Sequence, residues 1–425
     1  MRVLVTGASG FIGAHIVAAL RAAGHEVVRA LRSPPLGAVD AVACDFGRDT
    51  DPAVWVPRLA GVGAVVNCAG ILRERGADRF EAVHVATPRA LAQACAQVGI
   101  AGWVQISALG DPVDGEFLAS KHRGDAAVLE ALPDAVVLRP SLVYAAEGSY
   151  GGTTLLRAVA AAPVLALPRG GSQRIAPIAA ADVGAAVVAA LQRAPAAGQR
   201  IELVGPRALS LRDYLLAIRR WLGLPPPRTL AVPAPLARLA ARIGEWVGRG
   251  PLGLTLWRML ERGNLGGEDA ATRMRELLGL SPRDIDAVLA ARPAAAADRW
   301  HARLYWLAPL LRVALALLWL ASGVVGWLWS QADIQALLAP TGLGPDAALV
   351  LARAGASIDL VLGAALLAGR WVRPVLALMA LQLLAYTAFV GIVLPAAWLD
   401  PWGGLLKNLV VLVALAVAAA TAERS

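Results

Sequence analysis

The chain has 425 residues, more than one ordinary domain holds, and 57% of them are hydrophobic while only 17% are charged. Soluble proteins are about half apolar and about a quarter charged, so the composition argues against a wholly soluble chain and predicts that part of it lies in lipid. The net charge is +9, but the sequence contains no basic run and no basic–aromatic stripe. This distribution argues against nucleic acid as a partner and suits a cytoplasmic membrane face.

Short apolar runs alternate with helical patterns, such as 11–23 and 87–98, through residues 1–222. This alternation predicts an α/β Rossmann domain, a doubly wound parallel sheet that binds ligands beyond the carboxyl ends of its strands. The expected strands are 2–6, 26–31, 40–44, 64–68, 102–107, 135–139 and 200–204.

A glycine-rich turn follows the first expected strand and opens the first expected helix. Glycines there let the chain turn tightly, bring backbone amides to a diphosphate and pack the helix on the strand. We therefore expect a bound dinucleotide, and the alternative is a glycine turn in an empty Rossmann domain. The expected cofactor residues of this turn are Thr6, Gly7, Ser9, Gly10, Phe11, Ile12 and Gly13.

The second expected strand ends with Arg29, Arg32 and Ser33 nearby, where an NAD site usually has an acidic residue for the ribose hydroxyls. These side chains suit a 2′-phosphate through charge-assisted hydrogen bonds. We therefore expect NADP(H) rather than NAD(H), bound by Arg32 and Ser33, with solvated surface as the alternative role of the arginines. The third and fourth strand ends contribute further expected cofactor residues, namely Asp45, Phe46, Cys68, Ala69 and Gly70.

The three cysteines, Cys44, Cys68 and Cys95, fit no metal-ligand spacing, so we expect no metal and interpret them as small buried residues in a reducing compartment. His84, on the helical pattern after the fourth strand, is interpreted as a core or surface residue without a role in the site.

The pattern changes after residue 222. Proline-rich breaks at 224–227 and 233–235 precede amphipathic stretches around 235–249, 251–263 and 268–279. These features predict a helical membrane-proximal segment over residues 223–300. Trp246 and Trp257 either touch lipid headgroups there or cap a helical subdomain.

Residues 301–425 contain four apolar spans, each close to the ~20 residues that a helix needs to cross hydrocarbon. Tryptophans lie at or near their ends, as in an aromatic belt. We expect an all-α four-helix transmembrane bundle, and the alternative is a buried soluble bundle. The expected spans are 306–329, 347–369, 374–394 and 403–421.

The charges of the loops give an expected orientation. Arginines precede the first span, separate the second from the third and follow the fourth, whereas the other two loops carry only acidic charges. The positive-inside rule, and the lack of a signal peptide before the first strand, predict cytoplasmic N- and C-termini in a multi-pass protein of a bacterial-type inner membrane. Inside the spans, Asp359 is expected to pair with Arg353 or Lys407 or to be protonated, while both basic residues could also snorkel to an interface.

These motifs resemble the short-chain dehydrogenase/reductase superfamily in its extended and atypical branches. The Thr6–Gly13 turn is similar to the family's TGxxGxxG, and the likeness covers about residues 1–222. It looks closest to the group that contains the nucleotide-binding accessory subunit of respiratory complex I. Residues 301–425 resemble the DoxX-like membrane family by hydropathy and layout. Further matches to the superfamily are Ile106-Ser107-Ala108, Leu138-Arg139-Pro140-Ser141-Leu142-Val143-Tyr144, and Asp182-Val183 after Ala176-Pro177-Ile178.

The resemblance implies a Ser, a Tyr acting as general acid/base and a Lys four residues after the Tyr. Ser107 and Lys121 match the Ser and the Lys, but Phe117 stands in place of the Tyr and has no ionisable proton. The family's pattern also places Pro140 at the cofactor. The expected catalytic residues are therefore Ser107, Lys121 and Tyr144.

Three interpretations of Phe117 stay open. The domain binds NADP(H) without catalysis, with Lys121 holding the ribose; or Tyr144, Tyr150, Asp111 or a water on Ser107 handles the proton; or hydride passes to a quinone or flavin.

Two functions follow from these interpretations. One is a cofactor-binding scaffold or sensor that joins a membrane-protein assembly. The alternative is an NADP(H)-dependent oxidoreductase or epimerase acting on a membrane-soluble substrate such as a quinone, isoprenoid or lipid. A third function, that of a transporter, is supported only by the charged residues inside the spans.

Overall fold

The computed structural model describes residues 1–149, 151–192, 198–247, 253–401 and 403–422. The chain divides into two compact units, Met1–Ala302 and Arg303–Ser425, which are described separately below. The predicted division into 1–222, 223–300 and 301–425 stays a prediction.

The first unit is built on a seven-stranded sheet in the order β11-β6-β5-β4-β1-β2-β3, in which all neighbours are parallel. All seven strands coincide with predicted ones to within one or two residues, and the predicted Rossmann architecture is confirmed. Their bounds are β1 Arg2–Thr6, β2 Glu26–Leu31, β3 Ala41–Ala43, β4 Ala64–Asn67, β5 Gly102–Ile106, β6 Val136–Pro140 and β11 Arg200–Leu203.

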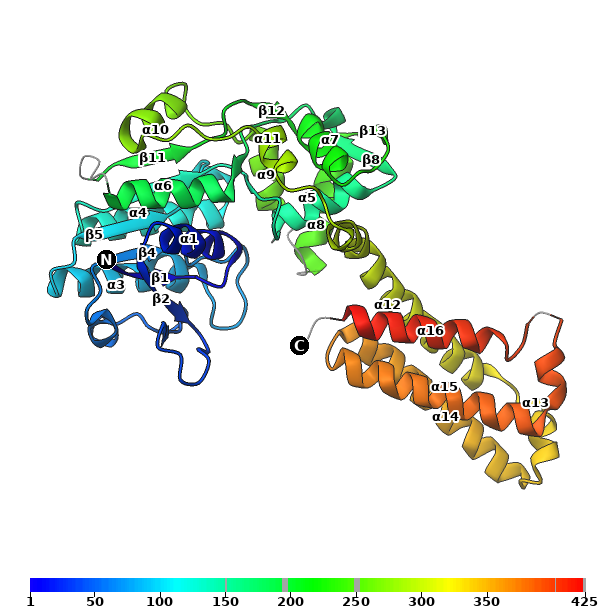
Figure 1. The fold of residues 1–425 in the computed structure, drawn as a ribbon. Helices are drawn as coiled ribbons and strands as arrows, with labels where there is room; N and C mark the ends of the chain where they lie inside the picture. The colour runs from blue at the N-terminus through cyan, green and yellow to red at the C-terminus, as the bar shows by residue number, and fades with distance from the viewer. Residues whose placement is uncertain (150, 193–197, 248–252, 402, 423–425) are drawn as a thin grey trace. The chain divides into compact units, whose positions relative to one another are not determined.

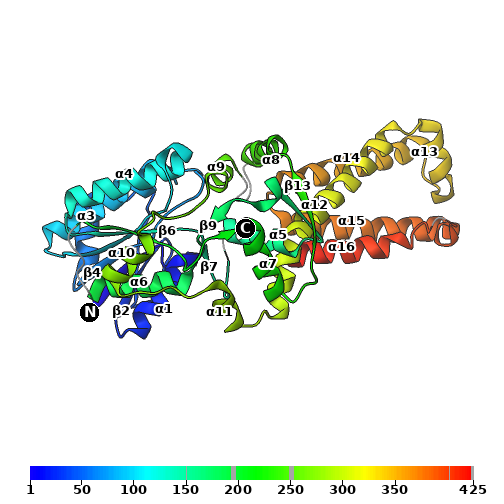
Figure 2. The ribbon, with the colours of Figure 1, turned by 90° about the horizontal axis from the view of Figure 1, so that it is seen from above.

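Helices cover both faces of this sheet because successive strand residues point to opposite sides. Val3 and Val5 of β1 pack with α1, α6 and α10, whereas Leu4 packs on the other face with α2, α3 and α4. Figure 2 shows α3 and α4 on one side of the sheet and α1 and α6 on the other. The helices are α1 Phe11–Ala22, α2 Pro52–Trp55, η1 Val56–Leu59, the π-helical η2 Glu81–Ala86, α3 Thr87–Gln97, α4 Glu116–Ala131, α6 Ala180–Gln192 and α10 Ala270–Leu278.

The strand order places a switch point between β1 and β4. The chain runs from β1 outward through β2 to β3, and then returns to the other side of β1 as β4. Ligands of open α/β sheets bind at the carboxyl ends of the two strands that flank such a point. Thr6 and Asn67, the last residues of β1 and β4, are partners in the strand register.

Three two-stranded sheets complete the first unit, and sequence patterns did not predict their short strands. A separate core of residues, including Tyr144 and Tyr214, underlies them. The strands pair as β7 Val143–Tyr144 with β10 Ile178–Ala179, β8 Val164–Pro168 with β13 Arg228–Val232, and β9 Arg174–Ile175 with β12 Leu209–Ser210. The other helices are η3 Pro112–Asp114, α5 Gly152–Ala161, η4 Arg169–Gly171, α7 Leu211–Trp221, α8 Ala234–Val247, α9 Leu254–Arg262 and α11 Ile285–Ala290.

The amphipathic stretches after residue 222 form α8, α9 and α10, apart from residues 248–252, which lie outside the described residues. Ion pairs tie this segment to earlier parts of the unit. Arg283 Nη2 lies 2.8 Å from Asp182 Oδ1, and Arg262 Nη2 lies 2.7 Å from Asp114 Oδ1. Trp257 is buried, which fits the capping role and not a headgroup contact.

The second unit is helical, with its bundle helices labelled in Figure 1. Among the described residues, α12, α14 and α15 are long and apolar enough to cross a membrane. The predicted fourth span is shorter than expected: α16 has 15 residues, because residues 404–406 form a turn before it, and it rises only about 22 Å. The elements are α12 Ala296–Leu328, α13 Gln331–Leu338, η5 Ala339–Thr341, α14 Pro345–Ala368, α15 Val372–Val393, η6 Pro395–Leu399 and α16 Lys407–Thr421.

Candidate functional site: the switch point of the sheet

The turn after β1 has a backbone that only glycine allows. Gly7 has a φ of +62°, and a Cβ there would lie 2.7 Å from the Cys68 carbonyl oxygen. A Cβ on Gly13 would lie 2.1 Å from the Gly7 carbonyl oxygen. Gly10 is the N-cap of α1 and makes no side-chain cap, so the amides of the first turn keep their capacity for an anion. With Ser9 and Gly10 exposed, these residues fit the diphosphate of a dinucleotide.

A buried hydrogen-bond chain fixes the strand ends beside this turn. The Thr6 hydroxyl donates to Asn67 Oδ1 at 2.5 Å, and Asn67 Nδ2 donates to Gln105 Oε1 at 2.9 Å. The Cys68 amide donates to Thr6 Oγ1 at 3.2 Å and the Ala69 amide to Asn67 Oδ1 at 3.2 Å. The ends of β1, β4 and β5 are therefore held together, and the Cys68–Gly70 backbone is placed at the switch point.

Lys121 reaches the same edge of the sheet from α4. Its ammonium donates to the carbonyl oxygens of Ala69 at 3.0 Å and Ile106 at 3.3 Å. A Cβ on Gly70 would lie 2.8 Å from Nζ, so glycine at position 70 makes room for the lysine. Burial lowers the pKa of Lys121 to about 8 in spite of the nearby Asp125 carboxylate. The lysine therefore carries most of a positive charge at neutral pH inside the site.

Phe117 lies one helical turn before Lys121, where the resemblance implies a tyrosine. Its ring makes edge contacts with His84, at 5.8 Å between centroids, and with Phe80 at 6.4 Å. Aromatic side chains therefore surround this position, and the ring itself carries no proton to exchange.

His84 lies beside Phe117 in the site, although sequence analysis assigned it no role there. The Ile71 amide donates to its Nε2 at 3.0 Å, so Nδ1 carries the proton and donates to Ser120 Oγ at 2.8 Å. Ser120 Oγ in turn donates to the Phe117 carbonyl oxygen at 3.1 Å. Burial, and then the Lys121 charge, lower the pKa of His84 to about 2, so the imidazole is neutral.

Ser107 faces a buried acid that sequence reasoning missed. Its hydroxyl donates to Asp125 Oδ2 at 2.8 Å, and Arg139 donates to the same oxygen at 2.9 and 3.1 Å. Asp125 is fully buried and lies four residues after Lys121 on α4. This spacing puts both residues on one helix face, which is the signal that could have found Asp125.

Tyr144 lies apart from this group. Its ring packs edge-on against Tyr214 at 6.3 Å in the core under the small sheets, and burial raises its pKa. Within the described residues its hydroxyl has no hydrogen-bond partner. Asp111 is exposed and caps η3 through the Val113 amide, and Tyr150 lies outside the described residues. The structure thus brings Ser107 and Lys121 together around Asp125, without Tyr144.

The residues expected to hold the adenosine part differ in exposure. Arg32 is exposed at the end of β2 and pairs with Asp78 at 2.6 Å and Asp45 at 3.8 Å. Arg29 pairs with Asp40 at 2.9 Å, and Ser33 is exposed.

The backbone carbonyl groups of Phe46 and Pro140 accept hydrogen bonds from other parts of the first unit. The Phe46 ring is buried against Trp55, at 5.7 Å between centroids, so it serves the core and not an open adenine face. Its carbonyl oxygen accepts a bond from Thr87 Oγ1 at 2.9 Å. Pro140 ends β6, and its carbonyl oxygen accepts the Leu109 amide at 3.0 Å.

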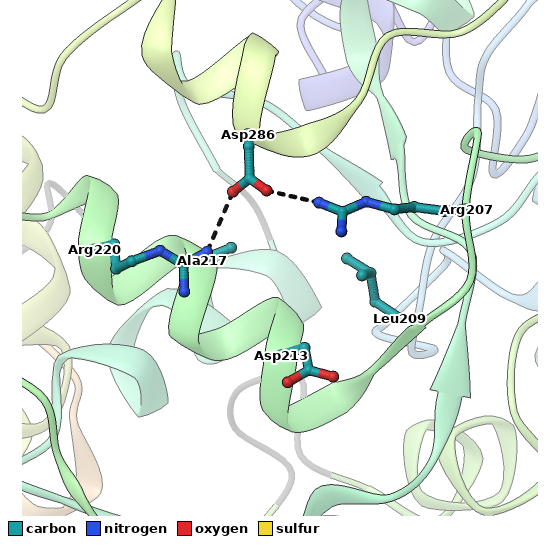
Figure 3. A pocket seen from close by; sticks show the side chains of 6 residues that line it. All are labelled: Arg207, Leu209, Asp213, Ala217, Arg220 and Asp286. Atoms are coloured by element: carbon teal, nitrogen blue, oxygen red, sulfur yellow. Dashed lines mark hydrogen bonds and ion pairs between the residues drawn. The ribbon is translucent and has the colours of Figure 1, made fainter.

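A separate polar pocket of about 230 Å³ contains none of the predicted site residues. Figure 3 shows Asp286 between Arg207 and Arg220, at 2.6 and 3.3 Å. Because these side chains are exposed and already neutralise one another, the pocket is best described as a solvated ion cluster.

Two family models match the chain. Residues 3–204 match the NAD dependent epimerase/dehydratase family, and residues 316–416 match the DoxX-like family. The DoxX-like match and the three apolar helices make this a membrane-associated protein.

Two curated proteins resemble the N-terminal part. Mitochondrial NADH dehydrogenase [ubiquinone] 1 alpha subcomplex subunit 9 of Arabidopsis thaliana is 31% identical over 257 residues, which are 56% of this chain and 61% of that protein. The ceramide reductase of Caulobacter vibrioides is 32% identical over 196 residues, which are 44% of this chain and 60% of that protein. The chain thus spans about three fifths of the length of these relatives.

Two solved structures show the same fold. The UDP-glucuronic acid 4-epimerase from Bacillus cereus in complex with NAD has a TM-score of 0.51 at 18% identity, over 72% of this chain and 98% of that one. The UDP-glucose 4-epimerase from Thermotoga maritima has a TM-score of 0.50 at 16% identity, over 68% of this chain and 98% of that one.

Proposed function

Because the chain joins an extended short-chain dehydrogenase/reductase domain to a DoxX-like membrane domain, we propose that it is a membrane-anchored NADP(H)-binding scaffold or sensor. The observation that carries this proposal is Phe117 beside Lys121. The lysine that would hold the nicotinamide ribose is present and buried, whereas the tyrosine that would move the proton is replaced by a ring wedged against His84 and Phe80. Binding without turnover follows from this combination. The likeness to a respiratory NADH dehydrogenase subunit favours a role in a membrane assembly.

The preference for NADP(H) rests on Arg32 and Ser33. Both are exposed just after β2, where an NAD site usually has an acidic residue for the ribose hydroxyls. A 2′-phosphate would compete with Asp78 for the Arg32 guanidinium, and a dianion is the stronger acceptor.

The test uses the full chain in detergent, with calorimetry for NADPH and NADH and the absorbance of the reduced nicotinamide for turnover. We expect NADPH to bind more tightly than NADH and to stay reduced for hours. Arg32→Ala should weaken NADPH binding roughly tenfold and leave NADH unchanged, because one charge-assisted hydrogen bond is lost. Arg89→Ala, which removes an exposed arginine paired with Glu130, is the matched control. Absence of affinity for either nucleotide, or steady NADPH oxidation without added substrate, would contradict the proposal.

A second candidate function is an oxidoreductase or epimerase acting on a membrane-soluble substrate, and the likeness to a ceramide reductase favours it. Bound NADPH supplies a hydride in such chemistry. Lys121, with a pKa of about 8, would give its proton to the substrate oxygen and become a neutral amine. NADPH oxidation driven by a long-chain ketone in detergent, and lost in Lys121→Met, would favour this function over the scaffold.

We further propose cytoplasmic N- and C-termini in a bacterial-type inner membrane, with domains at 1–222, 223–300 and 301–425. The arginines between the second and third spans support this orientation. Protease digestion of the N-terminal part in inside-out but not in right-side-out vesicles is the expected result, and the reverse pattern would refute the orientation.

A further inference from the structure

The second unit has a partly open cavity of about 500 Å³ among α12, α13, α14 and α15. This volume is typical of small-molecule sites, which range from ~300 to ~1,000 Å³. Most of the lining is aliphatic or aromatic, with Leu337, Leu351 and Phe389 as examples. Four lining side chains are clearly polar: Ser322, Asp359, Gln382 and Tyr386.

Asp359 is the centre of the polar part. The residue is 5% exposed, and its Oδ2 accepts from Ser322 Oγ at 2.7 Å while its Oδ1 accepts from Gln382 Nε2 at 2.6 Å. Gln382 is itself fixed by Trp319, whose Nε1 donates to Gln382 Oε1 at 3.0 Å. A carboxylate has about four acceptor positions, so two remain for another donor.

Arg353, on the same helix as Asp359, is engaged elsewhere. Arg353 donates to the carbonyl oxygens of Gly326, Trp327 and Trp329 at the C-terminal end of α12, and its guanidinium lies 5.0 Å over the Trp327 ring. The negative end of a helix dipole favours a cation there. The expected pairing of Asp359 with Arg353 or Lys407 is absent, since no ion pair of Asp359 occurs in the described part of the chain. Asp359 thus meets only neutral donors.

Gly355 shapes the cavity beside this carboxylate. A Cβ at position 355 would lie 2.1 Å from the Tyr386 hydroxyl oxygen, so only glycine lets that hydroxyl sit against α14. Both residues line the cavity, and Tyr386 lies one turn after Gln382 on α15. The polar groups are therefore gathered on one part of an otherwise apolar wall.

We propose that this cavity binds a lipophilic molecule with a hydroxyl at one end. Its apolar chain would lie along the aliphatic wall, and its hydroxyl would donate to a free acceptor position of Asp359. A hydroxyl suits the site better than an ammonium group, because carrying a charge into hydrocarbon costs far more than carrying a neutral donor. This site lies wholly within the DoxX-like unit and is independent of the nucleotide.

The test reconstitutes the full chain in nanodiscs with a diazirine-bearing long-chain alcohol, its methyl ether and the matched alkane as photoreactive probes. Mass spectrometry maps the labelled residues. We expect the alcohol to label α13, α14 and α15 at cavity residues, and the ether and alkane to label them weakly. Asp359→Asn, which keeps the shape but loses an acceptor oxygen, should reduce alcohol labelling roughly tenfold.

A steric pair of variants keeps the test decisive if Asp359→Asn does not fold. Ala354 and Ala347 are both exposed on α14, but only Ala354 lines the cavity. Ala354→Phe should abolish alcohol labelling of the cavity, and Ala347→Phe should not change it. Equal labelling by alcohol, ether and alkane would mean that acyl chains fill the space regardless of their end group, and would overturn the proposal. Unchanged labelling in Ala354→Phe would overturn it as well.

Discussion

The Thr6 hydroxyl and the Asn67 side-chain oxygen are 2.5 Å apart, and this bond joins the two strands that flank the switch point of the sheet. Thr6 also accepts the Cys68 amide, so one hydroxyl sets both the end of β1 and the backbone after β4. The geometry of the nucleotide site therefore depends on a residue whose side chain is fully buried.

Replacing Thr6 with Val keeps the shape and removes the hydroxyl. We expect a loss of about 1–3 kcal/mol in the free energy of unfolding, because Asn67 Oδ1 and the Cys68 amide lose a partner in a buried place. Weaker NADPH binding should accompany it. Chemical denaturation and calorimetry measure the two effects, with Thr50→Val on the exposed surface as control. Unchanged stability would show that the bond contributes nothing.

The Gly13→Ala substitution tests the close contact of α1 with the turn. The new methyl would lie 2.1 Å from the Gly7 carbonyl oxygen, so helix and turn must separate. We expect NADPH affinity to fall at least roughly tenfold and stability to fall by about 1–3 kcal/mol. In Gly152→Ala the new methyl meets nothing closer than 3.9 Å, and this control should behave like the wild type. Calorimetry that finds equal affinity in Gly13→Ala would refute the assigned diphosphate site.

Stability at acidic pH should depend on His84. Its pKa is about 2 in the folded state and 6.5 ordinarily, so below pH 6.5 the unfolded chain binds a proton that the folded one refuses. The free energy of unfolding therefore falls as the pH falls below 6.5, by up to about 1.4 kcal/mol per pH unit from this residue. Carboxyl groups add a slope of the same sign, so the measured quantity is the difference between the wild type and His84→Gln. The exposed His301→Gln should leave the slope unchanged.

At alkaline pH, Lys121 should likewise make the free energy of unfolding rise with pH. Its pKa is lowered from 10.5 to about 8, so between those values the unfolded chain holds a proton that the folded chain has lost. The contribution of Lys121 to stability therefore rises with pH through this window. Buried thiols act the other way, since the pKa of Cys44 is raised to about 11. Denaturation of the wild type and Lys121→Met between pH 8 and 9 separates them, and parallel curves would contradict the assigned pKa.

Most of the fold of the first unit could be predicted from local sequence patterns. The strands of the large sheet are continuous apolar runs buried on both faces, and such runs are visible in a sequence. The two-residue strands β7, β9, β10 and β12 have no period to detect, because their pairing depends on a core assembled from distant segments.

The parts of the site that depend on backbone geometry could be predicted from the sequence. The contacts of individual side chains were harder to predict. The glycine turn follows from a steric need at Gly7 and Gly13. By contrast, Phe46 faces the core, and Tyr144 packs on Tyr214, because burial of large rings outweighs their position at a strand end. Arg353 takes helix carbonyls in place of Asp359, an arrangement that no spacing in the sequence indicates.

The burial of Lys121 has a practical consequence, since the chain contains only one other lysine, Lys407. Lys121 is 6% exposed at the switch point of the sheet, so an acylating reagent can reach it only when the surrounding structure opens. Its acylation rate, followed by peptide mass, would report in real time how often this end of the sheet opens.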